Sequence, residues 1–270
     1  MRAGPSRTAF GAAVHRALHQ RLEEGRIFRD PCAIPILGPD GEAAMAEKSD
    51  AAQTGLRMFM AVRSRFAEDS LATAVARGVR QAVILGAGLD TFGLRNPHEG
   101  LRVFEVDHPA TQAWKRERIA AAGWTPSFIF APVDFERQEL GAQLAAAGFD
   151  GTQPAFFIWL GVVPYLTTEA IGKTLDFVAS IPGSEIVFDY SEPLENYPPE
   201  RRAMVEALGA RTAAIGEPWL SHFDPREISA LLHAKGFGQI EDLGVAAIAK
   251  RFFGREAPDT AGAHVLRARR

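Results

Sequence analysis

Between residues 81 and 190, short apolar segments alternate with longer stretches of helical composition, and this alternation constrains the fold more than any other feature. The apolar segments are rich in β-branched and aromatic residues, which is typical of strands that are buried on both faces. Strands joined by helices in this way form βαβ units with a parallel sheet. Five such strands are expected, at residues 81–88, 101–107, 127–134, 154–161 and 184–190.

The segments on both sides of this core complete the expected fold. Apolar residues recur with helical spacing from Ser6 to Leu22 and from Ser49 to Arg77, ahead of the first strand. After the fifth strand comes a helical, aromatic-bearing insert, and then a helix and two last strands. We therefore expect a doubly wound, mostly parallel, seven-stranded α/β sheet. The single domain, residues 1–270, would comprise a helical cap (1–80), a cofactor-binding core (81–190), a substrate lid (191–223) and closing elements (224–270).

Charge and composition exclude several classes of partner. The formal net charge of −3 leaves no excess of Lys and Arg to neutralise phosphates, so a nucleic-acid partner is not expected. Cys32 is the only cysteine, which rules out an internal disulfide and fits a cytoplasmic location. The longest apolar run, residues 154–166, is shorter than the roughly 20 residues that span a membrane. A small-molecule ligand is expected.

Two histidines on the first expected helix have the spacing of a metal-binding pair. His15 and His19 are four residues apart, so both can face one ion. However, the spacing of the sequence links no acidic residue or cysteine to them as a further ligand. We expect a solvent-facing pair and no metal site.

The first strand leads into a turn that carries Gly86 and Gly88. Glycines let a ligand approach the backbone closely. The dinucleotide-binding fingerprint needs a third glycine, and Thr91 occupies its place, which weakens the case for NAD or FAD. A tight strand-to-helix connection without any ligand would also use such glycines. The turn by itself therefore leaves the ligand open.

Two carboxylates are expected at the ends of the next two strands. Asp107 would lie at the carboxyl edge of the sheet, where it can accept hydrogen bonds from both hydroxyls of a ribose. Asp134 and Phe135 would place a second carboxylate and an aromatic ring at the same edge, suited to an adenine. Alternatively, the two acids are N-caps of the helices that follow them.

Six segments spread over nearly the whole chain carry a family resemblance: Ser6–Ala9 (SRTA), Arg63–Phe66 (RSRF), Leu85–Thr91 (LGAGLDT), Phe104–Pro109 (FEVDHP), Val133–Glu136 (VDFE) and Ile158–Leu166 (IWLGVVPYL). Through these segments the chain resembles the leucine carboxyl methyltransferase-like group of class I methyltransferases. The order and spacing of LGAGLDT and EVD make this resemblance more specific than a glycine turn alone. It implies an enzyme that uses S-adenosyl-L-methionine.

The resemblance also implies roles for the residues of the turn and of the strand ends. Gly86 and Gly88 would lie beside the methionine part of the cofactor. Asp107 would hold the ribose hydroxyls. Asp134 and the backbone of Phe135 would recognise adenine.

Two arginines and one apolar residue complete what the resemblance implies. Arg63, together with Arg7, would pair with the cofactor's carboxylate, for which a guanidinium has the matching bidentate geometry. Leu160 stands where the eukaryotic leucine carboxyl methyltransferases carry an acidic residue. This difference argues against the eukaryotic protein substrate.

Methyl transfer from a sulfonium to an oxygen depends chiefly on alignment of the reacting atoms. A carboxylate acceptor is already ionised at neutral pH and needs no base. A hydroxyl acceptor must lose a proton, and Tyr165 and His222 are the candidate bases.

Further candidates for contact with the acceptor lie after the fifth strand. Tyr190 ends that strand, and Tyr197, Arg211 and Trp219 lie in the expected lid. For the lid residues, packing or surface exposure is an equally good explanation.

These observations predict an S-adenosyl-L-methionine-dependent O-methyltransferase that acts on a small-molecule carboxylate or hydroxyl. Two alternatives stay open. The same turn and acidic residue suit an NAD-dependent oxidoreductase, and the same fold suits a non-catalytic cofactor-binding protein.

Overall fold

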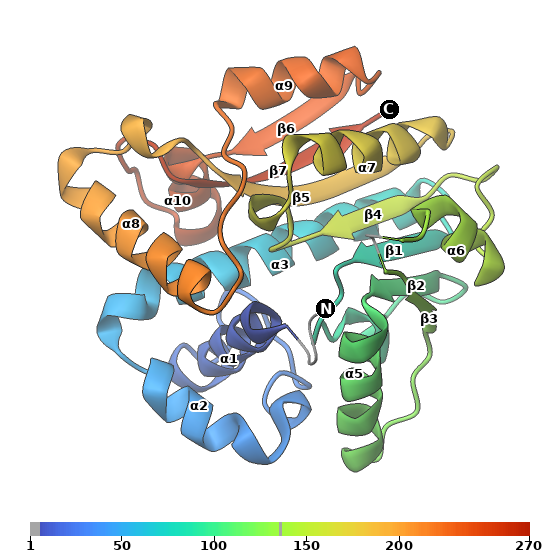
Figure 1. The fold of residues 1–270 in the computed structure, drawn as a ribbon, viewed down its shortest axis with the longest axis horizontal. Helices are drawn as coiled ribbons and strands as arrows, with labels where there is room; N and C mark the ends of the chain where they lie inside the picture. The colour runs from blue at the N-terminus through green and yellow to red at the C-terminus, as the bar shows by residue number, and fades with distance from the viewer. Residues whose placement is uncertain (1–5, 135–136) are drawn as a thin grey trace. The chain divides into compact units, whose positions relative to one another are not determined.

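The computed structural model describes residues 6–134 and 137–270 (Figure 1). The contacts within the chain divide it into two compact units, residues 1–151 and 152–270. The expectation of one domain over residues 1–270 stays a prediction.

The first unit begins with helices that pack on one another. Helix α1 (Arg7–Leu22) starts where predicted, because the Oγ of Ser6 accepts a hydrogen bond from the backbone N of Ala9 at 3.2 Å. α1 packs against α2 and α3. The other elements of this region are the 3₁₀-helix η1 (Pro35–Asp40), α2 (Gly41–Lys48), the 3₁₀-helix η2 (Ala51–Gln53) and α3 (Thr54–Ala76).

Three parallel strands in the order β3-β2-β1 follow in the first unit. Val83 of β1 pairs with Phe104 of β2, which pairs in turn with Ile129 of β3. In a parallel sheet all carboxyl ends meet at one edge, so the residues after these strands come close together. The elements are β1 (Gln81–Leu85), α4 (Phe92–Arg95), β2 (Arg102–Asp107), α5 (Pro109–Ala121), β3 (Ile129–Pro132) and α6 (Leu140–Ala146).

The second unit contains four strands in the order β4-β5-β7-β6. β4 and β5 are parallel, whereas β7 runs antiparallel to both of its neighbours, β5 and β6. Its elements are β4 (Phe156–Trp159), η3 (Val163–Tyr165), α7 (Thr168–Ser180), β5 (Glu185–Ser191), η4 (Leu194–Asn196), α8 (Pro199–Ala214), α9 (Pro225–Ala234), β6 (Gln239–Leu243), α10 (Val245–Phe253) and β7 (Ala263–Arg269).

The predicted fold class, a mostly parallel seven-stranded sheet flanked by helices, is confirmed. All seven predicted strands are present, most of them shorter than predicted. Helix α10 was not predicted. It begins directly after β6 and ends at Gly254, whose φ of 62° is in the left-handed region. Within the described parts of the chain, no helix has the length and apolar character needed to span a membrane.

Candidate functional site

The glycine turn after β1 is held close to the start of α1. Gly86 and Gly88 have φ angles of 66° and 46°, a region that side-chain-bearing residues rarely adopt. A Cβ built on Gly88 would lie 2.9 Å from the Cβ of Ala9, too close for an ordinary contact. Gly88 is thus required both by its backbone conformation and by the approach of α1.

Asp107 ends β2 and is bonded to this turn. One carboxylate oxygen accepts from the backbone N of Gly88 at 2.6 Å, and the other accepts from the backbone N of His108 at 2.7 Å. Burial raises the pKa of Asp107, and these two hydrogen bonds oppose the increase without cancelling it. An ionised carboxylate accepts about four hydrogen bonds, so acceptor capacity remains for a ligand.

Asp134 lies at the same edge, two residues beyond Pro132, which is the register partner of Asp107. Its carboxylate is 3.7 Å from the Nε of Arg137, and its backbone N donates to the side chain of Gln138 at 2.9 Å. Phe135 lies outside the described residues. The structure therefore brings Asp134 close to the end of β2, as the parallel sheet predicts.

The alternative that the two acids are N-caps does not hold. The N-cap of α5 is His108, whose Nδ1 accepts from the backbone N of Ala110 at 3.2 Å. The N-cap of α6 is Glu139, five residues after Asp134. Neither Asp107 nor Asp134 is therefore the N-cap of the helix that follows it.

The two arginines expected to face the cofactor's carboxylate differ in their surroundings. Arg7 is exposed in the first turn of α1, whereas Arg63 is buried in the middle of α3. Both belong to the first unit, as do all the described candidates for cofactor binding.

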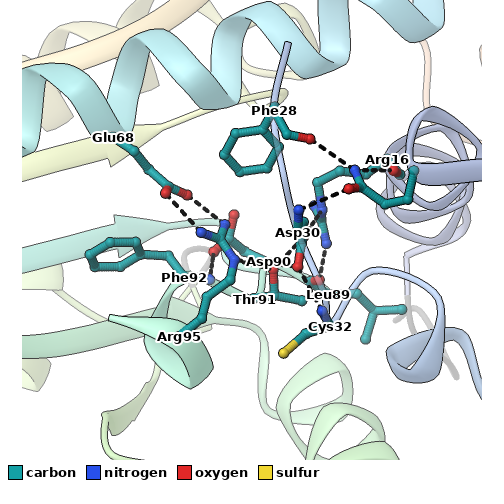
Figure 2. Close-up of polar contacts among 11 residues, drawn as sticks. Arg16, Phe28, Asp30, Cys32, Glu68, Leu89, Asp90, Thr91, Phe92 and Arg95 are labelled. Carbon is teal, nitrogen blue, oxygen red and sulfur yellow. Dashed lines mark hydrogen bonds and ion pairs between the residues drawn. The ribbon is translucent and has the colours of Figure 1, made fainter. Parts of the chain in front are cut away.

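A buried carboxylate that the sequence did not indicate, Asp30, connects the N-terminal helices to the glycine turn (Figure 2). Its Oδ2 accepts from the Nε of Arg16 at 3.0 Å and from the hydroxyl of Thr91 at 2.6 Å. Its Oδ1 accepts from the backbone N of Cys32 at 3.0 Å and lies 3.3 Å from the Nε of Arg95. Thr91, which replaces the third glycine of the dinucleotide fingerprint, is thus an anchor of this network.

The two arginines around Asp30 extend the network in both directions (Figure 2). Arg16 also donates through Nη2 to the carbonyl oxygen of Leu89, within the turn itself. Arg95 forms two hydrogen bonds with the carboxylate of Glu68 in α3, at 2.5 and 2.7 Å. α1, α3 and the Asp30 loop thereby fix the position of the turn.

A second buried ion pair lies next to Asp107. The Nζ of Lys115 in α5 is 2.6 Å from a carboxylate oxygen of Glu105, and both side chains are 1% exposed. Burial raises the pKa of Glu105 to about 7, although the charge and hydrogen bond of Lys115 oppose the increase. Lys115 also acts to lower the pKa of Asp107.

The prediction that His15 and His19 face the solvent is wrong. His15 is 4% exposed and His19 is fully buried. His19 accepts from the backbone N of Ile27 and of Phe28 through Nε2, and its Nδ1 lies 3.1 Å from Glu23. Among the described residues, no group of three or more His, Cys, Asp or Glu side chains could hold a metal ion.

A family model described as "Leucine carboxyl methyltransferase" matches residues 9–179. The chain belongs to the leucine carboxyl methyltransferase family. The match covers the glycine turn, Asp107, Asp134 and the Asp30 network. The predicted family is confirmed.

Similar proteins agree with this membership. A Bacillus subtilis protein named "Putative S-adenosyl-L-methionine-dependent methyltransferase YktD" is 38% identical over 278 residues, which is 92% of this chain and 91% of that protein. A Mycolicibacterium gilvum protein, also named "Putative S-adenosyl-L-methionine-dependent methyltransferase", is 35% identical over 282 residues, 94% of this chain and 88% of that protein. A crystal structure of "a putative methyltransferase" from Thermobifida fusca superposes with a TM-score of 0.61 at 18% identity, covering 99% of this chain and 95% of that one. The last match supports the fold alone.

In this member of the family, two of the acceptor-site candidates come together in the second unit. The rings of Trp219 and His222 meet edge to face, with centroids 6.0 Å apart. Both line a pocket of about 280 Å³ together with Val205, Gly209 and Ala213 of α8. Arg211 of the same helix and the His222 side chain are exposed, and Tyr165 is half-buried in η3.

The two remaining tyrosines of the methyltransferase are inside the second unit. The hydroxyl of Tyr190 donates to Asp242 at 2.6 Å, and its ring stacks on His264 with centroids 4.8 Å apart. Tyr197 is 3% exposed, and the guanidinium of Arg201 lies 5.6 Å from its ring centre. Packing accounts for both positions, and their contact with an acceptor stays a prediction.

Proposed function

We propose that this chain transfers a methyl group from S-adenosyl-L-methionine to an oxygen atom of a small organic acid or alcohol, with a carboxylate as the preferred acceptor. The observation that carries the proposal is the contact between Asp107 and the backbone N of Gly88, at the family motif LGAGLDT. This hydrogen bond holds a carboxylate, which can accept several hydrogen bonds, against the loop that would lie beside the cofactor.

The residues of the first unit suit the chemistry of this cofactor. Asp107 keeps acceptor capacity for the ribose hydroxyls, since each of its oxygens has one backbone donor in the structure. Arg63 would pair with the carboxylate of the methionine part. Asp134 would accept from the adenine amino group. The Asp30 network would keep the glycine turn in one conformation before the cofactor arrives.

When bound, the cofactor supplies a sulfonium methyl group: a lone pair of the acceptor oxygen forms the new O–CH₃ bond while the S–CH₃ bond breaks and its electron pair stays on sulfur. A carboxylate needs no proton transfer for this, and an apolar site favours the reaction because opposite charges are neutralised. The chain then only has to bind and orient the acceptor.

A hydroxyl acceptor would require a base. Tyr165 and His222 are the proposed candidates, and His222 is supported by its position beside Trp219 in the pocket under α8. The insert that contains this pocket, residues 191–223, is the proposed lid over the acceptor. The net charge of −3 supports a small molecule over a nucleic acid, and the single cysteine supports a cytoplasmic location.

An assay with methyl-labelled S-adenosyl-L-methionine tests the proposal. The protein is incubated with a panel of carboxylic acids, each paired with its primary amide, and with phenols and alcohols. We expect the label in the ester of an acid and none in the matching amide. The rate of transfer should not decrease when the pH is lowered below 7. No transfer to any compound, despite tight cofactor binding, would contradict it. Transfer only to hydroxyls, lost at acidic pH and in His222→Phe, would point to the base-dependent reaction.

A further inference from the structure

Two buried nitrogen atoms on neighbouring helices of the first unit lack hydrogen-bond partners. Nδ1 of His15 in α1 and Nη1 of Arg57 in α3 have none among residues 6–134 and 137–270. The two residues are only 4% and 3% exposed. A buried polar atom left unpaired costs about 1–3 kcal/mol, more when it is charged, so a ligand that pairs with both would gain this energy.

The other two nitrogens of the Arg57 guanidinium already have hydrogen-bond acceptors. Nε and Nη2 donate to the carboxylate of Glu23 at 2.6 to 3.0 Å, and Nη2 also donates to the hydroxyl of Thr54 at 3.2 Å. Glu23 in turn lies 3.1 Å from Nδ1 of His19, one helical turn after His15. Glu23 therefore neutralises Arg57 from one side only, and Nη1 is left for another acceptor.

The positive charges of three residues on two helices act on His15. Burial is the largest cause of its low pKa, which is about 4, and the positive charges of Lys48 in α2 and of Arg57 and Arg63 in α3 lower it further. His15 is consequently neutral at pH 7 and can donate from one ring nitrogen. The charged groups that act on it are all positive. This environment favours an anion in contact with His15.

This cluster lies close to the candidate cofactor loop. Arg16, the next residue of α1, donates to the carbonyl oxygen of Leu89 in the turn. Ala9, which would touch a Cβ on Gly88, precedes His15 by six residues, or about 9 Å along a helix. An anion held by His15 would therefore lie within the length of a small molecule from the turn.

We propose that Nδ1 of His15 and Nη1 of Arg57 form a subsite for an anionic group of the methyl acceptor. The inference rests on the proposed function and deepens it, because it makes the acceptor an acid. A guanidinium stabilises the negative charge of a bound carboxylate and so weakens it as a nucleophile. The subsite thus anchors one acidic group, and a different oxygen of the same molecule receives the methyl group. Hydroxy acids and dicarboxylic acids have both parts.

Nitrogen-15 NMR of the full chain, labelled at histidine and saturated with S-adenosylhomocysteine, tests this subsite. Inorganic phosphate and acetate are the probes, because they need no particular shape, and sodium chloride at equal ionic strength is the control. At neutral pH the Nδ1 signal shows whether this nitrogen carries a proton and donates. We expect both probes to move Nδ1 of His15 to the donor form.

His98 is the internal control in the same spectrum. Burial alone lowers the pKa of His98, whereas positive charges also lower the pKa of His15. The signals of His98 should stay unchanged by either probe. The subsite would be overturned if His15 responded to neither phosphate nor acetate. It would also be overturned if His98 responded as strongly as His15, or if His15 responded equally to sodium chloride. A shift of His15 on addition of S-adenosylhomocysteine alone would assign the subsite to the cofactor and also overturn the proposal.

Two variants measure the contribution of each donor. In His15→Phe and Arg57→Gln, binding of the acid found in the methyl-transfer assay should weaken about tenfold or more, the effect of losing one charge-assisted hydrogen bond. Affinity for S-adenosylhomocysteine should stay the same. Unchanged acid affinity in both folded variants would overturn the subsite. The titration of the wild-type protein needs neither variant, and failure of that protein to bind S-adenosylhomocysteine would contradict the proposed function instead.

Discussion

The Asp30 network predicts that Asp30→Asn destabilises the protein strongly although it changes few atoms. Asp30 is 1% exposed. Its carboxylate accepts hydrogen bonds from Arg16, from Thr91 and from the backbone N of Cys32, and it lies within ion-pair distance of Arg95. An asparagine keeps the shape but removes the negative charge between two guanidiniums. It also places an NH₂ group opposite donors.

The magnitude follows from what stays paired after the change. Arg95 keeps Glu68, and Arg16 keeps the carbonyl oxygen of Leu89, so neither cation loses every partner. Removing one partner of a buried ion pair costs about 3–5 kcal/mol, and we expect the lower end, about 3 kcal/mol. A domain with about 5–15 kcal/mol of stability would still fold.

Urea unfolding of Asp30→Asn and of a surface control measures this cost. The control is Glu42→Gln, which breaks the exposed pair with Arg21 and should leave the unfolding midpoint unchanged. Because the network holds Leu89 and Thr91, affinity for S-adenosylhomocysteine should fall in Asp30→Asn and not in Glu42→Gln. Equal midpoints for the two variants would refute this account of the network.

Three further predictions concern the turn and β2. Asp107→Ala should weaken binding of S-adenosyl-L-methionine by about 1.5–3 kcal/mol in calorimetry, the scale of hydrogen bonds to a charged group, and an unchanged affinity would remove its role at the ribose. Gly88→Ala should lower the free energy of unfolding more than Gly123→Ala, because Gly123 shares the positive φ but meets no other described atom within 4 Å of an added Cβ; equal losses would mean that the contact with Ala9 relaxes freely. The pKa of Glu105 is raised from 4.5 to about 7 in the folded chain. Between these two pH values the folded chain therefore binds more protons at Glu105 than the unfolded chain does. The free energy of unfolding should therefore fall as the pH rises through this range, and the fall should be smaller in Glu105→Gln. Identical pH profiles for the two proteins would contradict the assignment.

β1, β4 and β5 could be predicted from the sequence because most of their residues are apolar and almost all of them are buried. Their ends were less accurate where a special backbone conformation stops the strand. The first was predicted to reach residue 88, but β1 ends at Leu85 because Gly86 turns the chain with a positive φ. Helix α10 was difficult to predict because its nine residues lie between two strand candidates and its N-cap, Gly244, has no side chain to form a capping hydrogen bond.

The location of Asp107 could be predicted because strand order and spacing determine it. Asp30 could not, since only the folding of a loop onto the turn brings it to Thr91, sixty-one residues away. The prediction that His15 and His19 are exposed is wrong for a related reason. The apolar pattern of α1 indicates one buried stripe, but α2, α3 and η1 all pack on this helix. Its residues from Ala13 to His19 are consequently buried all around.

Calorimetric titration of the wild-type chain with S-adenosyl-L-methionine, S-adenosylhomocysteine and NAD tests the central claim most directly. The account predicts that the two adenosyl compounds bind and that NAD does not. It also predicts that Asp107→Ala weakens the binding of both adenosyl compounds. Binding of NAD alone, or of none of the three to a folded protein, would contradict it.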